Sequence, residues 1–407
     1  MTIPFYKGFA HPGSYPSDGH AGLWYDKFVR GWHNANKESL SFASYESLDS
    51  SGKKTTISPA SQWVGTLHHK NVGNSDLLHD YLIRMLDLLT ATGGHYLVAT
   101  TDWRFVTGMG KDHPVENGFA WHPTLGVPYL TGAAVKGMLR AWCEQWSSSF
   151  PGADKAKILR SWFGPSIEEL TSRQNRFDPS AGGLIFFDAL PIRPVRLQAD
   201  VMTPHYKDWY EKGGEGPEED GSNVPADWHS PVPVPFLTVA EGHSFLFAVA
   251  ARPASSIDLS KVIAELYDAL EWIGAGAKTA AGYGHMSEDR EAKKKIEVAF
   301  ARHREVMRRE EEKSQRRRDM EKMTPLQRDV TQLLLNKADP SMKDYVLLLK
   351  KLEEEFWPDK DNQRAVALKI KEMMQDDDVW REESSAKRPD KDGVYQRTLR
   401  VLKYLRQ

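Results

Sequence analysis

The chain has 407 residues, enough for two or three domains, and its 40% hydrophobic and 11% aromatic residues can supply a sizeable core. A formal net charge of −2 excludes a protein that binds nucleic acid through an overall positive field. The charge is uneven: from His285 onward there are 30 Lys+Arg and 26 Asp+Glu, against 24 and 30 before it. Any nucleic-acid site must therefore be local.

Cysteine content and hydropathy indicate the compartment. Cys143 is the single cysteine, so neither an intrachain disulfide nor a cysteine-based zinc site is expected. The first residues lack the basic and apolar regions of a signal peptide, and no apolar stretch is long enough to span a membrane. We expect a cytoplasmic protein.

Residues 1–94 are predicted to form an irregular and partly helical segment that packs on the core. Gly, Ser, His and aromatic residues dominate its first 75 positions. Apolar residues at helical spacing predict a helix over 76–91. A shorter helix is expected within 22–32, with three apolar residues on one face, Leu23, Phe28 and Trp32.

Residues 95–288 have the pattern of an α+β domain with a ferredoxin-like (RRM-like) βαββαβ fold. A flexible acidic insertion at about 199–235 interrupts the pattern. Related RNA-recognition modules present a sheet face to single-stranded RNA, although a fold alone assigns no function. The predicted elements are strand 95–108, helix 133–146, strand 182–192, a hairpin over 235–252 with its turn at Glu241–Gly242, helix 257–273 and a short final strand.

The remaining residues are predicted to be helical. Residues 289–323 are densely charged with sparse apolar residues, which is typical of a solvated linker helix. Thr324, Pro325 and Gln327 form a helix-start signal with a capping box. Residues 324–407 are therefore expected to be a small all-α domain, with periodic apolar residues that include Tyr345, Leu349, Leu352 and Phe356.

The segment 274–284, GAGAKTAAGYG, carries the main candidate for binding chemistry. Its bare backbone permits the positive φ angles of an amide nest that holds phosphate. It lacks the spacing of a P-loop, and it follows a helix, which excludes a dinucleotide fingerprint. A tight helix-to-strand turn built of small residues remains an equal alternative. The candidate RNA-binding residues are Gly274, Gly276, Lys278, Thr279, Gly282, Gly284 and Tyr283, which we expect to stack on a base.

Two further segments are weaker candidates. Lys136 and Arg140 share a face of the helix in 128–142, whose first amides favour anions, although an ordinary solvated face explains them as well. The loop 108–126 contributes His113 and Asn117, and its histidines lack metal-ligand spacing.

Catalytic and metal-binding motifs are absent from the sequence. Ser17, Asp18 and His20 lie together in a loop, but adjacency does not make a triad. The run Asp376–Asp378 is more typical of a solvated surface than of a magnesium site. We therefore expect no enzyme activity, no cofactor and no metal.

Taken together and in order, these segments resemble the RAMP superfamily of CRISPR proteins, specifically the subunits that cap the guide-bearing backbone of type III-B (Cmr) complexes. The similarity covers roughly residues 20–33 and 95–286. The resembling motifs are GLWYDKFVRGW, HPVENGFAWHPTLGVPYL, GGLIFFDALP, DVMTPHY, WIGAGAKTAAGYG and the helix entry PYLTGAAVKGMLRAW.

The resemblance implies that the chain binds guide RNA toward its 3′ end, assembles with other RAMP subunits and has no nuclease activity. It assigns phosphate contacts to Lys136, Arg140 and the loop around Lys278. It makes the insertion at 199–235, with His205 and Tyr206, a projecting thumb that can reach target RNA or a neighbour.

The sequence departs from the superfamily pattern at the helix entry. Ala133 and Ala134 replace the usual serines and Thr131 replaces a proline, so two hydroxyl donors are missing. Two alternatives stay open: a metal-independent endoribonuclease that processes guide precursors with His113, His122 or His205 as general base, and a structural adaptor that acts through the helical tail.

Overall fold

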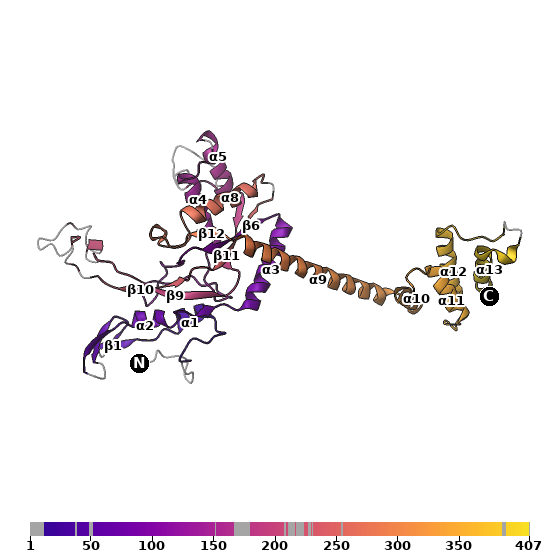
Figure 1. Cartoon of the computed structure of the whole chain (residues 1–407), viewed down its shortest axis with the longest axis horizontal. Coiled ribbons are helices and arrows are strands. Elements are labelled where there is room, and N and C mark those ends of the chain that lie inside the picture. The colour runs from indigo at the N-terminus through magenta and orange to yellow at the C-terminus, as the bar shows by residue number, and fades with distance from the viewer. Residues whose placement is uncertain are drawn as a thin grey trace. The chain divides into compact units, whose positions relative to one another are not determined.

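The computed structural model describes residues 12–36, 39–48, 52–150, 152–166, 180–206, 209–210, 216, 224–226, 229, 231–253, 255–384 and 388–406. The chain divides into two compact units, Met1–His303 and Arg304–Gln407 (Figure 1). The division falls within the long helix α9 (Arg290–Lys322).

The first unit contains the predicted ferredoxin-like sheet. Its strands are ordered β12-β6-β11-β7 and are all antiparallel, with β8 (Leu190–Pro191) also paired to β11. Numbered within the βαββαβ pattern, this is the order 4-1-3-2, so the predicted α+β fold is confirmed. The elements are β6 (His95–Thr101), α4 (Gly132–Gln145), β7 (Leu184–Phe186), β11 (Ser244–Ala251), α8 (Leu259–Trp272) and β12 (Met286–Glu288).

Both faces of this sheet are covered. Leu97, Phe245 and Phe247 point to the face on which α4 and α8 pack and belong to the main core. On the opposite face, Leu246 and Ala248 pack against helix α3 (Ser75–Thr92) through its residues Leu82, Met85, Leu86 and Leu89. Because α3 occupies the face that RRM-like modules use for RNA, any RNA must bind elsewhere on this unit.

A second sheet, ordered β10-β9-β5, supports the insertion (Figure 1). It consists of β5 (Asn71–Val72), β9 (Val195–Met202) and β10 (Val234–Val239). The predicted hairpin over 235–252 is therefore wrong, because β10 pairs with β9 while β11 pairs with β6. Both strands are buried at almost every position, so they lack the alternation that would have revealed their partners.

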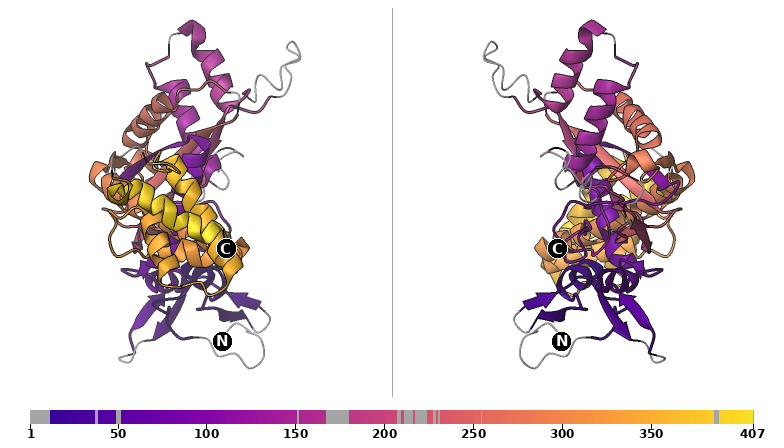
Figure 2. Two further views of the ribbon diagram at one scale, coloured as in Figure 1. Left: turned by 90° about the vertical axis from the view of Figure 1, so that its right-hand side faces the viewer. Right: turned by 90° about the vertical axis from the view of Figure 1, so that its left-hand side faces the viewer.

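Residues 12–72 hold more regular structure than expected. The helix predicted within 22–32 ends at Lys27, and its apolar face was assigned wrongly: Leu23 is 52% exposed, whereas Trp24 and Tyr25 are buried. Figure 2 shows the indigo N-terminal hairpins and the magenta α4 and α5 at opposite ends of this unit. The elements are α1 (Ala21–Lys27), β1 (His33–Asn36), β2 (Ser39–Ser41), β3 (Tyr45–Leu48), β4 (Lys54–Ile57), α2 (Pro59–Gly65) and, later in the chain, α5 (Gly152–Phe163).

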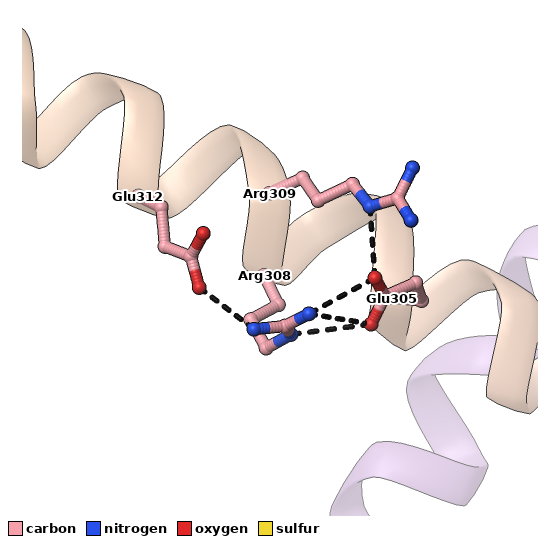
Figure 3. Close-up of polar contacts among 4 residues, drawn as sticks. All are labelled: Glu305, Arg308, Arg309 and Glu312. Carbon is pink, nitrogen blue, oxygen red and sulfur yellow. Dashed lines mark hydrogen bonds and ion pairs between the residues drawn. The ribbon is translucent and has the colours of Figure 1, made fainter. Parts of the chain in front are cut away.

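Helix α9 is solvated, as its composition predicts. None of its described residues is buried. Ion pairs at helical spacing support it: Glu305 pairs with Arg308 and Arg309 at 2.9 and 2.8 Å, and Arg308 also pairs with Glu312 at 2.8 Å (Figure 3). Near its start, Ile296 and Phe300 pack against the α3 side of the sheet, and such ion pairs support the part of the helix that lacks an apolar stripe.

The second unit has its own core. The Thr324 hydroxyl accepts from the Gln327 N–H and the Gln327 side chain accepts from the Thr324 N–H, so the predicted capping box is confirmed. Phe356 lies beyond the end of its helix and is 47% exposed. The core gathers residues of the later helices, α10 (Pro325–Leu335), α11 (Asp344–Glu353), α12 (Lys360–Asp376) and α13 (Gly393–Leu405).

Candidate nucleic-acid interface

Residues 274–284, hereafter the glycine loop, join α8 to β12 in a conformation that requires glycine. Gly274, Gly276, Gly282 and Gly284 have φ between +73° and +90°. A Cβ atom on Gly276 would lie 2.1 Å from the Val106 carbonyl oxygen, and one on Gly284 would lie 1.9 Å from the Ala275 oxygen. Lys278 shares the left-handed conformation with φ +58°, which is uncommon for a residue with a side chain.

The amides of the glycine loop are divided between internal bonds and free groups. Those of Gly274, Ala275, Ala277, Ala281, Gly282, Tyr283 and Gly284 donate to backbone oxygens. Among the described residues, the N–H groups of Gly276, Lys278, Thr279 and Ala280 have no acceptor. Three successive amides beside the Lys278 ammonium are thus available to an anion.

Tyr283 has a different role from the predicted one. It is 8% exposed and its hydroxyl donates to Asp200 Oδ2 at 2.7 Å, while burial and this bond raise its pKa to about 12. Its ring centroid lies 4.8 Å from that of Trp103 and 5.9 Å from that of Phe236. We call these three rings the aromatic row. Because Tyr283 is enclosed within it, the expected stacking of Tyr283 on a base is wrong.

Cations stand at both ends of the aromatic row. The Lys278 ammonium lies 5.6 Å from the Phe236 ring centre, and the Arg104 guanidinium lies 5.5 Å from the Trp103 ring centre. Arg104 also pairs with Asp200. Sequence reasoning missed Trp103 and Arg104 because it placed both inside a strand that in fact ends at Thr101.

Two histidines lie side by side in the region of Arg104. The rings of His68 and His69 lie 3.7 Å apart, and His68 Nδ1 accepts from the Ala199 N–H on β9. Desolvation lowers the pKa of His68, with further lowering by His69 and Arg104. The lowered pKa favours the neutral form of the His68 ring, so the positive charge at this place comes from Arg104.

The first backbone amides of α4 donate most of their hydrogen bonds to groups within the protein. The Gly132 N–H donates to Asp188 Oδ1 at 2.7 Å, and the Ala134 N–H donates to the Thr131 hydroxyl at 3.2 Å. An approaching phosphate would meet the Asp188 carboxylate, so the expected anion site at this helix start is disfavoured. Only the Ala133 amide of the first turn lacks an acceptor among the described residues.

The two predicted cations of α4 differ. Lys136 is half-buried and forms no ion pair with any described residue. Arg140 is occupied, because its Nε donates to Glu144 at 2.6 Å and its Nη1 donates to the Pro165 carbonyl at 3.4 Å. Lys136 therefore stays a candidate, whereas Arg140 would have to leave these partners to reach a phosphate.

The glycine loop and the start of α4 lie at different levels of the sheet. Gly132 abuts the Phe186 carbonyl at the end of β7, and the glycine loop abuts Phe105 and Val106 just beyond the end of β6. Both strands are antiparallel to β11, so they run in the same direction. Phe186 nevertheless pairs with Val249, which on its other side pairs with His95 at the start of β6. The start of α4 and the glycine loop therefore lie toward opposite ends of the sheet.

The histidines of the 108–126 loop are structural. His113 stacks on Tyr25 with ring centroids 4.4 Å apart, and its two nitrogens contact the Tyr25 carbonyl and the Val115 N–H. His122 Nδ1 accepts from the Leu125 N–H. Burial lowers the pKa of both histidines. His113 is therefore unavailable to RNA in this conformation. Asn117 is half-buried, and its Nδ2 has no partner among the described residues.

Comparison with known protein families agrees with this topology. The family model described as the RAMP superfamily matches residues 92–287, the region of the ferredoxin-like sheet.

Residues 92–287 belong to the RAMP superfamily.

Two curated relatives are similar to about half of the chain. The CRISPR system Cmr subunit Cmr6 of Pyrococcus furiosus is 29% identical over 248 residues, which covers 50% of this chain and 70% of the relative. The Cmr6 subunit of Saccharolobus solfataricus is 27% identical over 179 residues, which covers 44% of this chain and 50% of the relative.

Solved structures are similar as well. A cryo-EM structure of the type III-B Cmr-beta complex bound to cognate target RNA matches with a TM-score of 0.41 and 19% identity, over 57% of this chain and 71% of that chain. The crystal structure of Cmr6 from Pyrococcus furiosus matches with a TM-score of 0.29 and 27% identity, over 48% of this chain and 98% of that chain.

The insertion of the RAMP domain is described only in part. His205 is exposed and its ring lies 6.3 Å from that of Tyr206, which lies 6.3 Å from His229. Tyr210 is 75% exposed. Most other positions of the predicted insertion lie outside the described residues, so its thumb-like role stays a prediction.

The other candidates for chemistry have structural partners. His20, from the Ser17-Asp18-His20 loop, caps α1 by accepting from the Leu23 N–H. Asp377 pairs with Lys343 at 2.9 Å. In the described part of the chain, no three His, Cys, Asp or Glu side chains are grouped to hold a metal, and no helix is long and apolar enough to cross a membrane.

Proposed function

We propose that this protein is a non-catalytic subunit that binds CRISPR guide RNA toward its 3′ end and caps the RAMP backbone of a type III-B effector complex. The RAMP domain and the similarity to two Cmr6 subunits support a place in such a complex. Its partners are the guide RNA and other RAMP subunits, and the insertion approaches target RNA. The complex acts in antiviral interference.

The observation that carries the proposal is the sheet end with the glycine loop. Free amides of Lys278, Thr279 and Ala280 lie together with the Lys278 side chain, and Arg104 lies at the far end of the aromatic row. Backbone amides and cations grip a sugar–phosphate chain without reading its sequence. Because α3 covers the open sheet face, RNA passes over the sheet end instead.

The salt dependence of RNA binding tests this proposal. Binding of a labelled single-stranded RNA to the full chain is measured at several salt concentrations. For Z contacted phosphates the slope of log K against log salt is about −0.7Z, so Lys278→Ala and Lys136→Ala each make it shallower by about 0.7. Lys157→Ala, at an exposed position of α5, is the matched control and leaves the slope unchanged. Wild-type slopes in both test variants contradict the proposed site.

The positions of the histidines support the proposal that the protein is not a nuclease. A general base needs an accessible nitrogen within reach of the RNA. Both nitrogens of His113 are bonded inside the fold, and His122 is 9% exposed with its Nδ1 bonded to the Leu125 N–H. We expect repeat-containing RNA to remain intact with the protein in EDTA. Specific cleavage that disappears in His205→Ala establishes the endoribonuclease alternative instead.

A further inference from the structure

We infer that Trp103 is the residue on which one base of single-stranded RNA stacks when the backbone occupies the glycine loop. This inference rests on the proposed function and adds a contact to it. A sugar–phosphate chain held by amides leaves its bases free to find an aromatic surface nearby. Tyr283, the aromatic residue inside the loop, is enclosed and cannot supply that surface.

Trp103 is the open end of the aromatic row. Phe236 is 1% exposed and Tyr283 is 8% exposed, whereas Trp103 is 40% exposed. Atoms Cε3 and Cζ3 of the indole lie within 4 Å of where a Cβ on Gly282 would stand, so the indole borders the glycine loop. Of the three rings, only Trp103 is more than one-third exposed, so it is the one that a base can reach.

The main chain around Trp103 is fixed before RNA arrives. The Asp102 N–H donates to the His285 carbonyl at 3.0 Å, and the Gly284 N–H donates to the Arg104 carbonyl at 2.8 Å. These bonds flank Trp103 on both sides and join it to the end of the glycine loop. A side chain held on a rigid backbone loses little freedom on binding, which favours affinity.

Two cations, Arg104 and Lys278, lie at the ends of the aromatic row. The Arg104 guanidinium lies 5.5 Å from the indole, and Asp200 holds it there through their ion pair. Lys278 stands at the other end of the row, beside the free amides. The surface therefore offers phosphate contacts on one side and an indole on the other, which suits a single strand better than a duplex.

Replacing the indole tests the inference. With the full chain and a labelled single-stranded RNA, Trp103→Ala weakens binding about 5- to 150-fold, the range for losing one base–aromatic stack. The salt slope stays at the wild-type value because the indole carries no charge. Trp146→Ala, at a tryptophan that is 65% exposed after α4, is the matched control and leaves affinity unchanged.

Two further measurements separate stacking from a folding defect. Trp103→Leu keeps an apolar side chain without a ring and loses affinity like Trp103→Ala, whereas Trp103→Phe keeps a smaller ring and loses less. An RNA of the same length with abasic riboses binds wild type and Trp103→Leu equally. Equal binding of ordinary RNA by wild type and Trp103→Leu, or a shallower salt slope in that variant, overturns the inference.

The two proposals fail in different ways. If wild type binds RNA with the expected salt dependence but the Trp103 variants bind equally well, only the stacking role is removed. If wild type does not bind RNA, the proposed function and the stacking role are both removed.

Discussion

The Tyr283 hydroxyl donates a hydrogen bond to Asp200 Oδ2 over 2.7 Å and so joins the glycine loop to the strand that leads into the insertion. The same carboxylate pairs with Arg104, in the segment after β6. Burial alone raises the pKa of Asp200, but the bonds from Tyr283, Arg104 and the Val201 N–H outweigh it and hold the pKa below its usual value. One carboxylate therefore organises three segments.

Asp200→Asn is expected to destabilise the protein by about 1–3 kcal/mol at pH 7, because it leaves Arg104 without its anionic partner. A carboxylate with a lowered folded pKa stabilises the fold above its unfolded pKa of about 3.9 and loses this effect as the pH falls through the folded value. The difference between variant and wild type in urea unfolding should therefore narrow below about pH 4. Asp112→Asn, at an exposed loop position, provides the control.

Gly276→Ala is expected to destabilise the first unit by more than 1 kcal/mol, because its φ of +85° is strained for alanine and the added Cβ collides with the Val106 carbonyl. Gly137→Ala is the matched control. Gly137 lies inside α4 with nothing within 4 Å of its Cβ position, so alanine there raises stability by about 1 kcal/mol. The denaturant concentration at the midpoint of unfolding should fall for Gly276→Ala and rise for Gly137→Ala. A neutral effect of Gly276→Ala contradicts the loop geometry.

His243 should give the first unit an acid-sensitive stability. Its burial, together with Arg193 and Arg196, lowers its pKa to about 4, whereas the unfolded value is about 6.5. Between these values the unfolded chain binds a proton that the folded protein does not, so stability falls as the pH drops from about 6.5 to about 4.

The variant His243→Gln tests this pH dependence. It keeps an acceptor for the Arg196 N–H, which His243 Nε2 now accepts at 3.1 Å, and removes the titration. Between about pH 4 and pH 6.5, the unfolding free energy of the variant should depend less steeply on pH than that of the wild type, by up to the equivalent of one bound proton. His95→Gln, on the exposed side of β6, should keep the wild-type slope.

Ile370→Ala is expected to destabilise the second unit by about 2–5 kcal/mol, since Ile370 is fully buried in the core of that unit. Leu368→Ala, on the same helix α12 but at a position 49% exposed, should change stability by less than about 1 kcal/mol. Thermal unfolding of the two variants measures this difference. RNA affinity should match the wild type in both, and a loss confined to Ile370→Ala would place part of the RNA site in the tail.

Local signals in the sequence predicted the helices well. Asp258 and Gly274 bracket α8, Thr324 opens α10, and the φ of +73° at Gly274 is the left-handed helix end that its residue type indicates. Four glycines at the predicted loop likewise adopt positive φ. These features depend on neighbours within one turn, so one segment of sequence determines them.

The pairing of strands and the exposure of side chains could not be predicted from local sequence signals. The partners of β10 depend on β9, which lies more than thirty residues away across the insertion. Tyr283, which the sequence predicted to stack on a base, is enclosed by Phe236 and Asp200, whereas Trp103, for which the sequence predicted no role, is exposed. The Gly132–Asp188 bond similarly joins residues 56 positions apart. Such contacts are set by tertiary packing, which residue types alone do not encode.

The unpaired amides at Lys278, Thr279 and Ala280 have a consequence for the proposed binding of RNA. Main-chain N–H groups cannot tell a purine from a pyrimidine, and an indole stacks on either. A binding site built from these groups has no preference for RNA sequence. Under the proposed function, RNAs of different sequence would therefore bind this subunit with similar affinity.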